Sequence, residues 1–265
     1  MTTQFDYRMR SFRAHLLLHC CLYLGIFCIA GCDTLRPLQT PMPVRFYEGG
    51  LNPTGDLVIF LPGLGDDVEA FERAGFIDLL RRSSRPMDAV VADAHFGYYL
   101  DGSFLERVYE DIVLPYENAG YSRLFLVGVS LGGFGSIQLR QTLGSRIDGI
   151  VLFGPFLGED DLIREIEHGG GVQDWRRQLA HTPERDEQVW LWIDELIEPG
   201  TNRIPSAILA FGSRDKFERA GRLLARWLPD DDVFINDGGH DWATWSLLWA
   251  DVLESESWEG LGDSG

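Results

Sequence analysis

Residues 124–132 read Leu-Phe-Leu-Val-Gly-Val-Ser-Leu-Gly. The apolar run 124–127 leads straight into a G-x-S-x-G pattern centred on Ser130, and a stretch of helical pattern begins at Leu131. This pattern is typical of a sharp strand-to-helix turn, where glycines flanking the serine let neighbouring backbones approach closely. The segment therefore predicts a serine nucleophile held on a strained turn.

Apolar runs of the same kind recur on both sides of this segment. Continuous apolar runs bounded by turn residues are typical of strands buried on both faces of a sheet. Stretches of helical length and pattern lie between most of them. The expected strands are 57–61, 89–92, 124–127, 149–153, 207–211 and 233–235, and the expected helices are 68–82, 103–118, 131–142, 216–228 and 241–253.

This alternation predicts a doubly wound α/β fold with a mostly parallel sheet. Ligands bind such sheets outside the carboxyl ends of the strands, so the loops after the apolar runs are the expected place of function. The interval 155–203, after the strand at 149–153, breaks the alternation and carries Trp175, Trp190 and Trp192. We interpret it as a helical cap whose apolar side covers the site, with a simple surface insertion as the alternative.

A serine hydroxyl needs a base to take its proton. We expect His240 to be that base, because its Gly-Gly-His turn follows the last expected strand at the same edge as Ser130. His95 follows the strand at 89–92 and is a candidate pocket residue. His168 and His181 lie in the charged insertion and are expected on the surface.

The base in turn needs an acid that holds its tautomer. Asp215 follows the run 207–211 at the same edge and is the first choice. Asp237, just before His240, is the second, although a position so close in sequence is more easily explained as a turn residue. The order Ser130, Asp215, His240 is the chain order of one known family of enzymes.

On these residues, and over about residues 45–253, the chain resembles the α/β-hydrolase family. The resemblance implies Ser130 as the nucleophile, Asp215 as the acid and His240 as the base. It implies an esterase-like serine hydrolase that cleaves a carboxylic ester or a related acyl bond of a small molecule through an acyl-enzyme. Since there is room for one strand before Leu57, the sheet is expected to be shortened at its N-terminal edge.

Members of this family stabilise the oxyanion with two backbone N–H groups. One belongs to the residue after the nucleophile, which is Leu131 here. The other comes from the loop after an early strand, which corresponds to 61–66 and implies Leu64. This loop carries Pro62 where the family's pattern has histidine, and Gly65 stays open as an alternative donor.

The composition is that of an ordinary globular protein, with 265 residues of which 45% are hydrophobic and 24% charged. The 23 basic and 41 acidic residues give a formal net charge of −18, which disfavours binding to nucleic acid. Asp66 and Asp67 have no histidine nearby and favour a helix start over a metal site, so we expect no metal and no organic cofactor. Trp242, Trp245 and Trp249 share one face of the last expected helix, which favours packing over a substrate platform.

The N-terminal segment has the layout of a secretory signal peptide. Arg8, Arg10 and Arg13 precede an apolar stretch at 16–29. All four cysteines lie at position 32 or earlier, so no disulfide is available to the rest of the chain.

The end of this segment, Ile29-Ala30-Gly31-Cys32, resembles a bacterial lipobox, in which cleavage precedes the cysteine and its thiol is lipidated. The resemblance implies a lipoprotein signal peptide at 1–31 and a membrane anchor at Cys32 in the bacterial cell envelope. Asp33 favours the periplasmic side of the inner membrane. The alternatives are an ordinary signal peptide and an uncleaved anchor, for which the apolar run is short.

The remaining boundaries follow from composition. We expect a Pro-rich, extended tether at 32–45, a hydrolase domain at 46–253 with the cap-like insertion 155–203, and an acidic tail at 254–265 that frays. A second hypothesis for the function is an envelope binding or scaffold protein that keeps this fold without catalysis.

Overall fold

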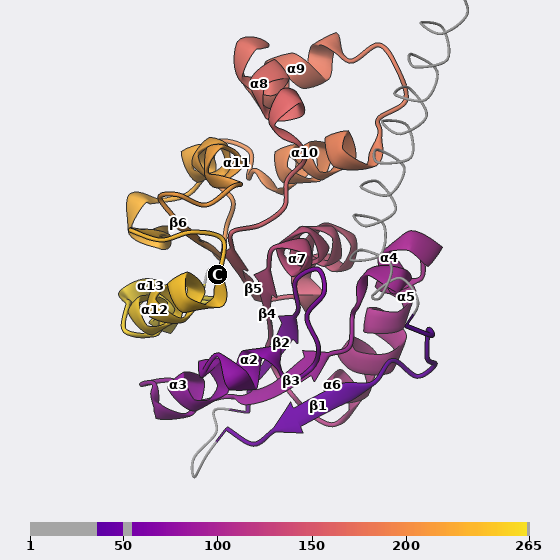
Figure 1. Cartoon of the computed structure of the whole chain (residues 1–265), viewed down its shortest axis with the longest axis vertical. Coiled ribbons are helices and arrows are strands. Elements are labelled where there is room, and N and C mark those ends of the chain that lie inside the picture. Colours follow the sequence, from indigo (N-terminus) through magenta and orange to yellow (C-terminus); the bar gives the residue numbers. More distant parts are fainter. Residues whose placement is uncertain (1–35, 50–54, 264–265) are drawn as a thin grey trace, which may run out of the picture.

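The computed structural model describes residues 36–49 and 55–263 and is built around one seven-stranded sheet (Figure 1). The strand order is β1-β3-β2-β4-β5-β6-β7, in which β1 runs antiparallel to β3 and every other neighbouring pair is parallel. The strands are β1 (Val44–Tyr47), β2 (Leu57–Leu61), β3 (Asp88–Ala92), β4 (Leu124–Val129), β5 (Gly149–Phe153), β6 (Ala207–Gly212) and β7 (Val233–Asn236). The predicted doubly wound, mostly parallel sheet is confirmed, and within the described residues β1 is the one strand that precedes β2.

Each face of the sheet has its own apolar core. Along β2, Leu57, Ile59 and Leu61 belong to one core, and Val58 and Phe60 belong to the other, as the alternation of side chains in a strand requires. Helices cover both faces, which explains why the central strands are apolar throughout. One face is covered by α4 (Phe96–Asp101), α5 (Phe104–Val108), α6 (Leu114–Asn118), α7 (Leu131–Leu143) and α11 (Glu218–Leu224), and the other by α2 (Ala70–Arg73), α3 (Phe76–Arg82), α12 (Trp242–Leu253) and α13 (Glu256–Glu259).

Two helices expected from the sequence are interrupted. The stretch 68–82 forms α2 and α3, which are separated by Gly75 in the left-handed conformation at φ 79°. The stretch 103–118 is helical along most of its length, but a π-helical turn, Tyr109–Val113, joins α5 to α6. At the first of these breaks, a glycine at positive φ ends the helix without steric cost, and a pattern of apolar residues does not reveal such a break.

The insertion after β5 is helical, as expected, and consists of α8 (Asp160–His168), α9 (Val172–Gln178) and α10 (Arg185–Leu196). In Figure 1, α8 and α9 stand beyond the sheet, whereas α10 lies close to α7. Trp190 of α10 is fully buried, and its Nε1 donates a hydrogen bond of 2.7 Å to the Leu157 carbonyl oxygen. Trp175 is buried within the insertion, where its Nε1 donates to Glu165 at 3.0 Å.

The predicted tether at 32–45 is wrong for the part that the structure describes. Met42 is buried, and its N–H donates to the carboxylate of Asp111 at 2.7 Å. The Tyr98 hydroxyl both accepts from the N–H of Gln39 and donates to its carbonyl oxygen, each at 3.0 Å. Proline-rich sequence predicts extension but not docking, and here an extended segment satisfies its backbone groups on the domain.

The prediction that the tail frays is also wrong up to residue 263. Trp258 and Leu261 are buried in the same core as α12. Arg85 donates to the carbonyl oxygens of both residues, at 3.0 Å and 2.9 Å. The acidic, glycine-rich composition indicated a solvated tail, but two apolar side chains find a site that is made by distant segments.

The signal peptide at 1–31 and the anchor at Cys32 lie outside the described residues. Among the helices of residues 36–49 and 55–263, none combines the length and the apolar character needed to cross a bilayer. The same part of the chain holds no cluster of histidine, cysteine and acidic side chains suited to a metal ion.

Candidate active site

Ser130 sits on the turn between β4 and α7 in a strained backbone conformation, with φ 53° and ψ −111°. Its N–H donates to the Phe153 carbonyl oxygen at 2.9 Å, and its own carbonyl oxygen accepts from the N–H groups of Gly133 and Phe156 at 3.0 Å each. These bonds to β5, to α7 and to the loop after β5 hold the serine in a conformation that it would not adopt alone.

The two glycines of the G-x-S-x-G pattern are required because a side chain fits at neither position. A β-carbon on Gly128 would lie 2.3 Å from the carbonyl oxygen of Gly132. A β-carbon on Gly132 would lie 2.0 Å from the carbonyl oxygen of Leu61 at the end of β2. The turn is therefore pressed against its own helix and against the neighbouring strand, as the pattern predicted.

The structure brings Ser130, His240 and Asp215 into one hydrogen-bonded chain. His240 Nε2 lies 3.0 Å from Ser130 Oγ, and His240 Nδ1 lies 2.8 Å and 2.9 Å from the two carboxylate oxygens of Asp215. A carboxylate accepts the Nδ1 proton, which leaves Nε2 free to accept the proton of the serine. The side chain of Asp215 is fully buried and that of His240 is 13% exposed, so water competes little for these bonds.

The alternatives for the base and the acid lie elsewhere. Asp237 is exposed and pairs with Arg214 at 2.9 Å. His95 is buried, where its Nδ1 accepts the N–H of Gly97 at 3.2 Å and begins α4. As expected, His168 and His181 are exposed on the insertion.

The His240 ring is held between two aromatic rings, Phe217 at 4.9 Å and Trp245 at 4.8 Å, both edge to face. Trp245 and Trp249 are buried, so the predicted packing role is confirmed for them. The site also depends on Gly154, which sequence reasoning missed. At φ 45°, its β-carbon would lie 2.6 Å from the Asp215 carboxylate, and a glycine directly after an expected strand is a signal that points to such a position.

The loop 61–66 lies beside the serine. A turn closed by the Asp66 N–H on the Gly63 carbonyl oxygen at 3.2 Å places Gly65 at φ 84°, as in a type II turn. Leu64 lines the same pocket as Ser130 and Leu131. Within the described residues the backbone N–H groups of Leu64 and Leu131 donate no hydrogen bond, since Leu131 opens α7 and has no helical acceptor.

The two adjacent acids in and after this loop differ. Asp67 accepts the N–H of Glu69 at 2.9 Å before α2, as a helix start predicts. Asp66 instead accepts the indole N–H of Trp242 at 3.1 Å, and burial raises the pKa of its carboxyl although Trp242 and the N–H of Gly63 act to lower it. Asp66 thus ties the loop beside Ser130 to the first residue of α12, a link that the sequence did not reveal.

A pocket of about 490 Å³ opens at Ser130. Its wall is mostly apolar and aromatic, with charged side chains of both signs among them. The insertion contributes Trp192, Arg185 and Asp186, so the prediction that the insertion covers the site holds for Trp192, whereas Trp175 and Trp190 pack elsewhere. The lining residues are Leu64, Phe96, Tyr99, Gly102, Phe104, Leu105, Ser130, Leu131, Phe134, Gln138, Phe156, Glu159, Arg185, Asp186, Trp192, Lys216 and Phe217.

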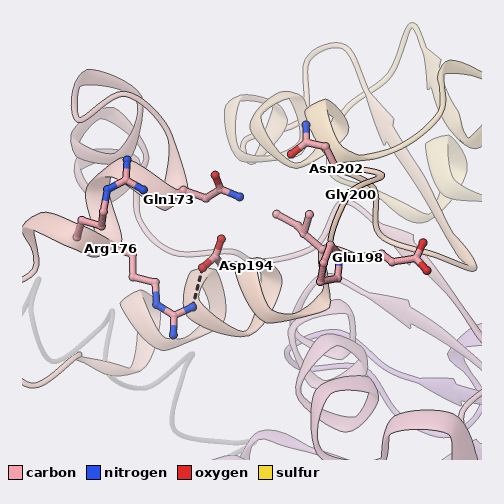
Figure 2. A pocket seen from close by; sticks show the side chains of 9 residues that line it. Gln173, Arg176, Asp194, Glu198, Gly200 and Asn202 are labelled. Atoms are coloured by element: carbon pink, nitrogen blue, oxygen red, sulfur yellow. Dashed lines mark hydrogen bonds and ion pairs between the residues drawn. The ribbon is translucent and has the colours of Figure 1, made fainter.

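A second cleft of about 560 Å³ lies within the insertion, between α9, α10 and the loop at 197–202 (Figure 2). Its lining is largely polar and includes Gln173, Glu198 and Asn202. Arg176 spans part of it and pairs with Asp194 at 2.6 Å. None of the lining residues belongs to the Ser130 site.

Three features together define an α/β-hydrolase fold: the strand order, the turn between β4 and α7 that carries Ser130, and the sheet edge at which Ser130, Asp215 and His240 meet. Est1E from Butyrivibrio proteoclasticus is similar, with a TM-score of 0.55 and 13% identity over 80% of this chain and 92% of that one. The fluorophosphonate-binding serine hydrolase F of Staphylococcus aureus is similar at a TM-score of 0.54 and 16% identity, over 77% and 83%. A ferulic acid esterase gives a TM-score of 0.50 and 15% identity, over 75% and 82%.

No protein-family model and no curated protein matches the chain. The similarity is therefore one of structure, and it shows that the chain has the α/β-hydrolase fold.

Proposed function

We propose that this protein is a serine hydrolase that cleaves a carboxylic ester or a related acyl bond with Ser130, His240 and Asp215. The hydrogen-bonded chain from Ser130 Oγ through His240 to Asp215 carries the proposal. The pocket that opens at the serine and the esterases and hydrolases of the same fold also support it.

The reaction follows from this geometry. Ser130 Oγ attacks the acyl carbon while His240 Nε2 takes its proton, and Asp215 stabilises the imidazolium that results. The carbonyl oxygen becomes an oxyanion, for which the N–H groups of Leu131 and Leu64 are the proposed donors. His240 then protonates the leaving group, and the bond from that group to the acyl carbon breaks.

An acyl-enzyme on Ser130 remains. Water attacks the acyl carbon as His240 takes one of its protons, and the proton returns to Ser130 when the acid leaves. Every proton in both halves passes through His240 Nε2. The aromatic wall of the pocket favours an apolar acyl or alcohol group on a small molecule.

A fluorophosphonate probe tests this function. We expect covalent labelling of the wild type at Ser130 and turnover of a short activated ester. Ser130→Ala should prevent labelling and lower kcat by about 10⁴-fold or more, His240→Ala by a similar factor and Asp215→Ala by less.

Ser213→Ala is the matched control, because this exposed serine lies two residues before Asp215 and outside the hydrogen-bonded chain. A folded protein that neither labels nor hydrolyses any ester would favour the second hypothesis, a binding protein of the cell envelope without catalysis.

We also propose that Cys32 carries a lipid that anchors the protein in the bacterial envelope, on the periplasmic side of the inner membrane. The signal-peptide layout of residues 1–31 and the lipobox-like ending support this. Cys32→Ala should move the protein from the membrane fraction to a soluble or unprocessed form. Unchanged membrane attachment of a processed Cys32→Ala chain would contradict the anchor.

A further inference from the structure

The described chain begins beside the loop 61–66, whose Leu64 lines the Ser130 pocket. Arg36 donates to the carbonyl oxygen of Asp66 at 3.3 Å, and Asp66 ends the loop whose Leu64 lines the pocket. Two residues later, Leu38 contacts α4, since a β-carbon on Gly97 would lie 3.1 Å from the Leu38 Cδ2 atom. The N-terminal segment is therefore bonded to the structure that forms one side of the pocket mouth.

The N-terminal segment and the two segments that it contacts, the loop 61–66 and α4, each carry an exposed leucine. Leu38 is 41% exposed, Leu100 of α4 is 51% exposed and Leu64 is 62% exposed. Leu38 packs on Gly97, and Leu100 lies three residues further along α4, on a neighbouring part of the same helix surface. Large exposed apolar side chains that cluster indicate a surface that meets an apolar partner.

The length of chain before Arg36 limits where a membrane can lie. Cys32 precedes Arg36 by four residues. Even fully extended, such a stretch spans about 14 Å. A lipid on Cys32 would therefore hold the docked segment, and with it the rim of the pocket, at the bilayer surface.

We infer that the mouth of the Ser130 pocket faces the bilayer, that Leu38, Leu64 and Leu100 contact it, and that the substrate is an acyl ester drawn from the bilayer itself. The inference rests on the proposed function and on the proposed anchor at Cys32. The apolar, aromatic wall of the pocket suits an acyl chain that leaves the hydrocarbon region.

The charge of the protein favours a bilayer surface without net negative charge. A formal net charge of −18 opposes close approach to anionic headgroups. Neutral or zwitterionic lipids lack this repulsion, so three leucines and one anchor are expected to suffice there.

A fluorescent label measures this contact without relying on catalysis. The chain has no cysteine after Cys32, so Leu100→Cys provides a single thiol for an environment-sensitive dye in the lipidated protein. Leu247→Cys is the matched control, because Leu247 is 64% exposed on α12, which covers the opposite face of the sheet. In phosphatidylcholine vesicles that contain a lipid-borne quencher, we expect quenching of the label at position 100 and not at position 247.

Turnover gives an independent readout. Leu38→Ser combined with Leu100→Ser should lower hydrolysis of a methylumbelliferyl oleate embedded in phosphatidylcholine vesicles by about tenfold or more, because the apolar contact is lost. Hydrolysis of soluble methylumbelliferyl acetate should stay unchanged, since neither residue lines the pocket. Leu247→Ser should affect neither substrate.

Equal quenching at positions 100 and 247, or unchanged vesicle turnover by the double serine variant, would overturn the inference. If the wild type did not hydrolyse the acetate at all, the proposed function would be overturned instead. The quenching experiment would still report on the membrane contact. A chain purified without a lipid on Cys32 would overturn both the anchor and this inference.

Discussion

Gly154 has no side chain, yet it sets the space in which Asp215 and His240 meet. A β-carbon there would lie 2.6 Å from the Asp215 carboxylate and 3.2 Å from His240 Nδ1. The contact would force apart the hydrogen bond that orients the imidazole. Proximity effects are steep, since a displacement of about 1 Å costs about 100-fold in rate.

We therefore expect Gly154→Ala to lower kcat by about 100-fold or more. It should lower stability by more than about 1–2 kcal/mol, the cost of a positive φ in a residue with a side chain, because the contact with Asp215 adds to that cost. Gly144→Ala is the matched control, because Gly144 has φ 57° but open space around it. It should lose only the stability that the positive φ costs, measured by urea denaturation, and no activity. Equal kinetics in the two variants would show that Gly154 does not shape the site.

Asp66 and Asp67 make opposite predictions for the pH dependence of stability. Burial raises the pKa of Asp66 above its ordinary value of 3.8. The stability that depends on its protonated form is present below 3.8 and is lost as the pH rises through the raised pKa. The free energy of unfolding of the wild type relative to Asp66→Asn should therefore fall as the pH increases above 3.8.

Asp67 is the control for this measurement. Its slight burial acts to raise its pKa, but the hydrogen bonds from Arg73 and from the Glu69 N–H lower it below 3.8. The wild type should gain stability over Asp67→Asn as the pH rises toward 3.8 from below. Parallel curves for the two variants in urea titrations at pH 3 to 7, a range chosen about the ordinary carboxyl pKa, would contradict both assignments.

Two tryptophans of α10 lie in different environments. Trp190 is fully buried, is 6.5 Å from the ring of Trp227 and donates to the Leu157 carbonyl oxygen. Trp192 is only partly buried, packs 5.8 Å from the Phe134 ring and lines the pocket. One residue therefore attaches the insertion to the body, and the other lines the pocket that opens at Ser130.

These positions should separate in experiment. Trp192→Ala is expected to change the preference among ester chain lengths with little effect on Tm, because it enlarges the pocket. Trp190→Ala should lower stability by about 3–5 kcal/mol and leave the chain-length profile unchanged. Kinetic profiles on acetate, butyrate and octanoate esters and a thermal melt of each variant distinguish the two, and an altered profile in Trp190→Ala alone would reverse the roles.

The last described residues hold together parts of the molecule that are far apart in sequence. Trp258 packs against Trp249 with ring centroids 5.2 Å apart, while Arg85 bonds to the Trp258 carbonyl oxygen and to Asp56 at 3.3 Å. A buried guanidinium whose partners are removed leaves an uncompensated charge, so the tail and the sheet stabilise each other.

Trp258→Ala should therefore lower the free energy of unfolding by about 3–5 kcal/mol. Glu259→Ala, an exposed change in the same short helix, should stay within about 0.5 kcal/mol. Urea denaturation of both variants makes the comparison. A Trp258→Ala protein as stable as the wild type would contradict the stabilising role of the Trp258 side chain.

The fold and the three polar residues of the site were predictable because their signals are local. A buried parallel strand is an apolar run, and the carboxyl ends of such strands meet at one edge. Ser130 follows β4 directly, and Asp215 and His240 lie in the short loops after β6 and β7. The glycines beside Ser130 mark the turn for the same reason, since the close approach involves neighbours in sequence. Signals of this kind need no knowledge of the rest of the molecule.

What escaped prediction depends on contacts between distant segments. Met42 bonds to Asp111 and Asp66 bonds to Trp242, in each case across more than sixty positions of sequence. Trp258 is buried in a core to which segments far from it in sequence contribute. Composition indicated a tether and a frayed tail, because it measures average polarity and not the few apolar residues that find a partner. The strands, the turn and the position of Ser130 follow from residues that are neighbours in sequence. The limits of the domain, the walls of the pocket and the role of Gly154 arise only when the folded chain brings remote surfaces within van der Waals reach.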